Sequence, residues 1–201
     1  MPSNLTTSDL QRAGVGSFFR PRDVLPIGIT PYQIQRLVAQ GVVELAAPGL
    51  YRVSDAEATE TETIAMVASA VPHAIVCLLS ALRVHDIGTQ SPRQVWLAID
   101  RKARKPRRLP AAVRIVRFSG QMLTYGVDVQ SMQGVRVRIT SPARTVIDCF
   151  RYRNKIGVDV AMEALRDAVH SRKALIGEID RAAEVCRIST VIAPYLEALS
   201  A

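Results

Sequence analysis

The sequence lacks long apolar runs and has few cysteines, and each shortage excludes a class of protein. Three cysteines stand far apart in 201 residues, which fits neither a disulfide framework nor the paired spacing of a zinc site. No stretch approaches the roughly 18 apolar residues of a membrane-spanning helix. The opening "MPSNLTTSDLQRAG" has no apolar signal-peptide core. We therefore expect a cytoplasmic protein with core cysteines, and no cofactor, metal or membrane partner.

Acidic residues are scarce in residues 101–153, which carry 13 lysines and arginines against two acids. The run "RKARKPRR" at 101–108 is too charged to be buried and predicts an exposed loop between two strands. Two interpretations of this loop stay open: it binds DNA, RNA or an acidic protein surface, or it is a solvated loop without a binding role. Few aromatics interleave with it, which favours phosphate contact over base stacking. The predicted basic patch comprises Arg101, Lys102, Arg104, Lys105, Arg107, Arg108, Arg114, Arg117, Arg136 and Arg138.

Residues 29–53 predict a helix, a sharp stop and a small β-hairpin. Thr30 supplies an N-cap hydroxyl, Pro31 suits the first helical position, and Gly41 ends the helix. The segments "VVEL" and "LYRV" then flank a Pro-Gly turn, as in a hairpin. We expect the buried face of the helix to comprise Ile34, Leu37 and Val38.

Two shorter helical segments precede this unit, over residues 5–13 and from Pro21 to about Pro26. The order of three helices and a two-stranded hairpin predicts a winged helix-turn-helix over residues 1–54. The acidic stretch 54–63 then marks the boundary with a second domain over residues 55–201.

No Asp or Glu occurs between Val24 and Val43, so nothing on the helix that begins at Pro31 would repel DNA phosphates. Glutamine pairs with adenine, and arginine with guanine, in the major groove. We therefore predict DNA contact, against the alternative of a solvated face in a structural domain. The predicted DNA-reading residues are Thr30, Tyr32, Gln33, Gln35, Arg36 and Gln40.

The second domain is predicted to be mixed α/β, with a small, mostly antiparallel sheet and a helical C-terminus, so the chain as a whole is α+β. Strands are predicted at 95–99, 113–118, 127–132 and 135–139. Helices are predicted at 57–71, 142–150, 158–171, 176–187 and 190–199, and a further helix is predicted to end at about His85. In "VRVRI", Arg136 and Arg138 are expected to face outward. Pro194 predicts a bend or break in the last helix.

Few residues suggest catalysis, and we predict that the protein is not an enzyme. Asp100-Arg101-Lys102, with Asp86 upstream, weakly resembles the acids and lysine of a metal-dependent nuclease. His85 is better explained as a packed or capping side chain, since no nucleophile is placed with it. Arg144 and Asp148 stand four apart on one helix and predict a structural ion pair, worth about 0.3–0.5 kcal/mol if exposed.

Three stretches together resemble the AbiEi family of type IV antitoxins: "GLYRV", "LLSALRVHDIGTQSPRQVWLAI" (78–99) and "TSPARTVIDCF" (140–150). The resemblance spans nearly the whole chain, although family members show His-Gly where this chain has His85-Asp86. It implies a repressor that binds inverted promoter repeats, as a monomer in solution or a dimer on DNA. It also implies neutralisation of a nucleotidyltransferase-like toxin by the second domain, directly or indirectly, without catalytic residues.

The resemblance further implies that phosphate contacts come from the helix start and the hairpin, through Arg20, Arg22 and Arg52. Two alternatives stay open from the residues alone. One is a DNA-binding transcriptional regulator without a toxin partner, and the other is the metal-dependent nuclease.

Overall fold

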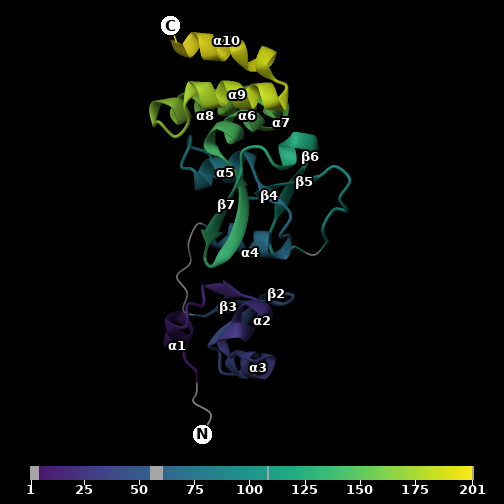
Figure 1. The fold of residues 1–201 in the computed structure, drawn as a ribbon, viewed down its shortest axis with the longest axis vertical. Helices are drawn as coiled ribbons and strands as arrows, with labels where there is room; N and C mark the ends of the chain where they lie inside the picture. The colour runs from purple at the N-terminus through teal and green to yellow at the C-terminus, as the bar shows by residue number, and fades with distance from the viewer. Residues whose placement is uncertain (1–4, 55–60, 108, 201) are drawn as a thin grey trace. The chain divides into compact units, whose positions relative to one another are not determined.

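The computed structural model describes residues 5–54, 61–107 and 109–200 (Figure 1). The chain divides into two compact units. The first comprises Met1–Pro72, Pro106–Ala111 and Gln130–Val137, and the second comprises His73–Lys105, Ala112–Val129 and Arg138–Ala201. The domain boundary predicted after residue 54 falls at residues 55–60, outside the described residues, and stays a prediction.

The first unit joins short helices to a three-stranded antiparallel sheet. Its helices are α1 (Thr7–Arg12), α2 (Pro21–Val24), the 3-10 helix η1 (Leu25–Ile27), α3 (Pro31–Ala39) and α4 (Glu62–Ala70). Its strands are β1 (Phe18–Phe19), β2 (Val43–Ala47) and β3 (Leu50–Val53), in the order β1-β3-β2. The predicted hairpin is confirmed. Strand β1 escaped prediction because two residues are too few to show alternation.

A small core holds the first unit together. Ile34 and Leu37 of α3 are buried in it, as predicted, with Leu10, Phe19, Val24, Ile29, Val43 and Val53. Val38 was predicted to share this face but is 39% exposed. One residue beyond Leu37, it lies a further 100° or so around the helix, which turns its side chain to the edge of the buried face.

A five-stranded sheet in the order β6-β5-β4-β8-β7 forms the centre of the second unit. Residues 130–137, which include the turn between β7 and β8 and the adjoining strand ends, are assigned to the first unit. The strands are β4 (Ile75–Val76), β5 (Val95–Asp100), β6 (Val113–Phe118), β7 (Val127–Met132) and β8 (Val135–Thr140). The prediction of a mostly antiparallel sheet is wrong, because β5 pairs in parallel with β6 and β4 in parallel with β8. Strands β4 and β5 pair antiparallel, so the sheet is mixed.

The parallel pairing of β5 with β6 has a simple cause. The basic segment that follows Asp100 continues to Ala112 before β6 begins. A connection of about a dozen residues is long enough to carry the chain back to the end of the sheet where β5 started. The sequence predicted this segment as a loop between two strands, but it is a crossover and not a hairpin turn.

Helices cover this sheet, and α6 is the central one. The helices are α5 (Leu78–Val84), the 3-10 helix η2 (Gly120–Leu123), α6 (Pro142–Arg151), α7 (Arg153–Ile156), α8 (Val158–His170), α9 (Ile176–Cys186) and α10 (Ser189–Ser200). Helix α6 packs against α5, α8 and α9, and α10 lies on α9 (Figure 1). Helix α10 continues through Pro194, so the predicted break is absent.

The interior of the second unit contains Cys77, Cys149 and Cys186, all buried and free, as predicted. Burial raises the pKa of the Cys77 and Cys149 thiols well above their usual range. None of the helices in the described part of the chain has the length and apolar character needed to cross a membrane.

Candidate functional site

The start of α3 is held by a reciprocal cap between two residues that were predicted to contact DNA. The Thr30 hydroxyl accepts a hydrogen bond from the Gln33 backbone N–H at 3.3 Å, and Gln33 Oε1 accepts from the Thr30 backbone N–H at 2.8 Å. This capping box satisfies two backbone donors that the helix itself leaves unpaired. Thr30 and Gln33 therefore fix the start of α3, and the side chains of both residues already accept hydrogen bonds from backbone N–H groups.

The outward side of α3 is neutral and partly apolar. Tyr32 is 69% exposed, and Gln35 and Gln40 are also exposed, whereas Arg36 is half-buried. Val38 adds an exposed aliphatic group. Helix α3 contains no acidic residue. The helix thus offers amide and phenol hydrogen-bonding groups together with apolar contact area.

The three arginines assigned to phosphate contact differ in their surroundings. Arg20 Nε donates to Ser69 Oγ of α4 at 3.1 Å. Arg52 forms ion pairs of 2.9 Å with both Glu44 and Glu62, and its hydrogen bond to Glu44 raises the pKa of Arg52.

Arg22 keeps a side chain that is 73% exposed, with the Asp23 carboxylate 3.6 Å away. Of these three arginines, Arg22 is the one whose side chain is predominantly in solvent. Arg20 and Arg52 instead connect β1–α2 and the hairpin to α4 within the first unit.

The basic loop after β5 is exposed, as predicted, and its first turn is ordered by hydrogen bonds. Asp100 Oδ1 accepts from the Lys102 backbone N–H at 2.7 Å, and Arg117 Nη1 donates to the carbonyls of Asp100 and Ala103 at 2.9 and 2.6 Å. The exposed cations of this turn in the second unit are Arg101, Lys102, Arg104 and Lys105. Arg107 is exposed and belongs to the first unit, while Arg108 lies outside the described residues.

The remaining arginines of the predicted patch have separate roles. The guanidinium of Arg114 lies 4.7 Å from the Trp96 ring centroid, a cation–π contact. Arg138 was predicted to face outward, but it is half-buried and donates to the carbonyls of His73 and Leu123 at 3.0 and 2.8 Å. These two hydrogen bonds hold the guanidinium against the protein and keep the side chain from extending fully into solvent. Arg136 is exposed, as predicted.

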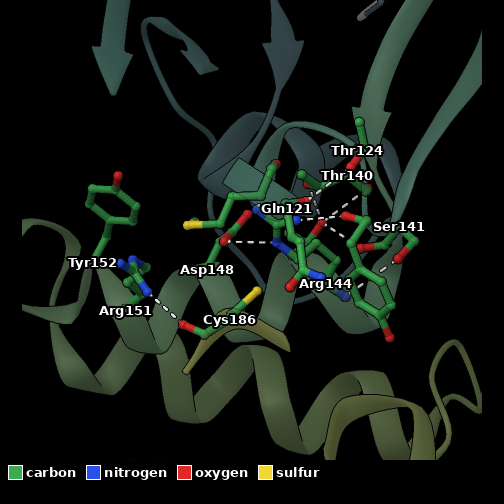
Figure 2. Close-up of polar contacts among 12 residues, drawn as sticks. Gln121, Thr124, Thr140, Ser141, Arg144, Asp148, Arg151, Tyr152 and Cys186 are labelled. Carbon is green, nitrogen blue, oxygen red and sulfur yellow. Dashed lines mark hydrogen bonds and ion pairs between the residues drawn. The ribbon is translucent and has the colours of Figure 1, made fainter. Parts of the chain in front are cut away.

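Helix α6 contains a buried arginine network in place of the exposed pair considered from sequence. Arg144 Nε donates to Asp148 Oδ1 at 3.0 Å, and both side chains are 0% exposed (Figure 2). Arg144 also donates to the carbonyls of Tyr125 at 2.6 Å and Met122 at 3.1 Å. The weak contribution of an exposed pair therefore does not apply, because both charges are removed from water.

Asp148 is the less satisfied partner. Its Oδ2 is buried without a hydrogen-bond partner among the described residues. Burial raises the pKa of Asp148 to about 6, although the charge of Arg144 acts in the opposite direction.

The residues of the nuclease hypothesis have other contacts. The half-buried His85 holds its Nε2 atom 2.6 Å from the Thr140 carbonyl, the packed role predicted for it, and burial lowers its pKa. Asp86 pairs with Lys173 at 3.1 Å, and Asp100 caps the turn described above. Within the described ranges, no group of three His, Cys, Asp or Glu residues is placed to hold a metal ion.

Compared with models of known protein families and with curated proteins, the chain matches no family and no curated protein. The resemblance to AbiEi antitoxins therefore stays a prediction made from the three sequence stretches.

Proposed function

We propose that this chain is a DNA-binding transcriptional repressor and an antitoxin, the function implied by the resemblance to the AbiEi family. In this proposal the first unit acts as a winged helix-turn-helix, with α3 as the recognition helix and the β2–β3 hairpin as the wing. The single observation that carries the DNA-binding part is the exposed, acid-free side of α3, which is held in place by its capped start.

The chemistry of that side suits base readout. Gln35 offers an amide that can bond adenine, and Arg36 a guanidinium for guanine. Tyr32 and Val38 supply apolar area for thymine methyl groups. Arg22, with its solvent-facing charge, is the best placed of the three predicted arginines to hold a phosphate.

The DNA-binding part is tested with the promoter upstream of the chain's own gene. We expect the double variant Tyr32→Ala/Gln35→Ala to lose about a hundredfold in affinity for the promoter, since each good base contact is worth about 1–3 kcal/mol. Binding to scrambled DNA at the same salt should hardly change. Gln11→Ala on α1, another exposed glutamine, is the matched control. Unchanged promoter affinity in the double variant would contradict the proposal.

The antitoxin part assigns the basic turn after β5 to an acidic surface of a nucleotidyltransferase-like toxin. Charge reversal by Lys102→Glu, Arg104→Glu and Lys105→Glu should then abolish co-purification and neutralisation while promoter specificity persists. Reversal of the exposed Arg166, Arg172 and Arg181 serves as the control for net charge. If the loop variant still neutralises the toxin, this contact is wrong; if no toxin partner exists, the protein is a regulator alone.

A further inference from the structure

A pocket of about 480 Å³ lies in the second unit, at the C-terminal ends of α6 and α9 and beside η2. Its lining combines polar and apolar groups, which is typical of small-molecule sites of this size. The residues used below are Ser119, Gln121, Met122, Arg151, Cys186 and Arg187.

The polar part of this lining carries positive charge only. Arg151 and Arg187 contribute two guanidinium groups, and no carboxylate lines the pocket. A second pocket of the same unit, about 670 Å³, is lined by three carboxylates, Asp159, Glu163 and Asp167, together with Arg166 and His170. The pocket beside η2 is therefore the one of these two that suits an anion.

One of the two guanidinium groups is positioned by the fold. Arg151 Nη1 donates to the Cys186 carbonyl at 2.7 Å (Figure 2). That bond uses one of the five N–H donors of an arginine and leaves the others for a ligand. Arg187 has no hydrogen-bond or ion-pair partner in the described part of the chain, and its side chain is exposed.

The backbone at Arg187 indicates that its side chain is not needed for the fold. Arg187 ends α9 in the left-handed conformation, with φ 57° and ψ 48°. Glycine adopts this conformation without steric cost and is the usual residue at such helix ends. Glycine would suit this backbone at least as well, so replacing Arg187 with glycine should remove the guanidinium without disturbing the fold.

The floor of the pocket is apolar. Met122 and Cys186 are both buried, and each lines the pocket. We propose that this pocket binds a small organic phosphate monoester. Two guanidinium forks match the charge of about −1.5 to −2 and the three oxygens of such a phosphate. The organic part covers the apolar floor, with Ser119 and Gln121 as neutral hydrogen-bonding groups at the rim.

The experiment uses the full chain, with adenosine monophosphate and inorganic phosphate as probes in isothermal titration calorimetry at low salt. We expect saturable binding of the nucleotide and weaker binding of inorganic phosphate, which leaves the floor uncovered. Arg187→Gly should weaken nucleotide binding about tenfold or more, since it removes charge-assisted hydrogen bonds. Arg151→Gln should weaken it similarly, but this variant also loses the bond to Cys186.

The chain supplies a matched control for Arg187→Gly. Arg172 is exposed, also has a left-handed backbone at φ 55°, and does not line the pocket. Arg172→Gly should therefore share any change in thermal stability but leave nucleotide binding unchanged. Absence of saturable binding, equal binding of inorganic phosphate, or an Arg187→Gly variant that binds like the wild type would overturn the proposal.

This pocket is independent of α3, so promoter affinity separates its failure from that of the proposed function. Arg187→Gly should leave promoter binding unchanged. If promoter DNA displaces the nucleotide competitively, the pocket binds nucleic-acid phosphates and the small-molecule assignment is wrong.

Discussion

Helices α3 and α6 begin alike and are used in opposite ways. Each starts with a hydroxyl residue followed by proline, Thr30-Pro31 in α3 and Ser141-Pro142 in α6. In each, the hydroxyl accepts a hydrogen bond from the backbone N–H three residues later. Yet α3 buries only two of its residues, whereas α6 buries every residue from 143 to 150.

The two helices differ in how they use the side chain of their third residue, Gln33 in α3 and Arg144 in α6. In α3 the side chain of Gln33 turns back to the helix start and closes the capping box. In α6 the side chain of Arg144 runs into the interior, to Asp148 and two backbone carbonyls. The start of a helix is therefore set by local sequence, while the use of its surface depends on what packs around it.

Removing the α6 arginine should produce the largest effect. Arg144→Ala leaves Asp148 and two carbonyls buried without their donor, so we expect a loss of about 3–5 kcal/mol in the free energy of unfolding. Urea unfolding of the full chain measures it. Gln33→Ala, at the same position of α3, should cost about 1 kcal/mol or less.

A double variant distinguishes two causes of the instability of Arg144→Ala: the loss of the hydrogen bonds of Arg144, and the burial of the Asp148 carboxylate without its partner. Arg144→Met with Asp148→Leu removes both charges and should be more stable than Arg144→Ala. A double variant as unstable as the single one would mean that the bonds to Tyr125 and Met122, and not the orphaned carboxylate, dominate.

The buried Asp148 of α6 should also give the free energy of unfolding a pH dependence. Burial raises the pKa of Asp148 from 3.8 to about 6 in the folded chain. Between these values the native state binds more protons than the unfolded state, so the free energy of unfolding should fall as pH rises from about 4 to about 6 and level off above.

Asp148→Asn should lack this decline. The difference in unfolding free energy between wild type and variant isolates it, because other carboxylates, such as Glu163 and Asp167 with their lowered pKa values, contribute to both. A difference that stays constant from pH 4 to 7 would show that Asp148 is ionised throughout that range.

The two N-caps provide the next comparison, with a smaller effect. Thr30→Ala and Ser141→Ala each remove one hydroxyl acceptor and should each cost about 1 kcal/mol. Ser141 should cost more, because its helix lies in the interior and its N–H groups have less access to water. Chemical denaturation at pH 7 measures both, and a larger loss at Thr30 would contradict this order.

These contrasts also explain what could be predicted from sequence. Hydroxyl-proline starts, the stop at Gly41 and the alternation in "VRVRI" predicted the bounds of α3, α6 and β8 to within one residue, and the predicted bounds of β6 and β7 are confirmed as well. The burial of Arg144 was not predictable, because it donates to the backbone carbonyls of Met122 and Tyr125, and any residue type has such a carbonyl. The same holds for Arg138 and the carbonyl of His73. The pocket at Arg187 was not predictable either, because its lining comes from η2, α6 and α9, which are far apart in the sequence.

The smallest stability effect makes the sharpest test of what α3 is for. Gln33→Glu keeps the capping box, since a glutamate oxygen accepts the same bonds, and it adds a negative charge at the positive end of the helix. We therefore expect the free energy of unfolding to stay the same or rise by about 0.3–1 kcal/mol.

If α3 lies against DNA, the same charge should repel phosphates and lower promoter affinity about tenfold or more. Gln11→Glu on α1 is the control for added charge. A variant that is as stable as wild type and still binds its promoter normally would show that the start of α3 lies away from DNA. In that case the capped start would serve only the fold, as the equivalent turn of α6 does.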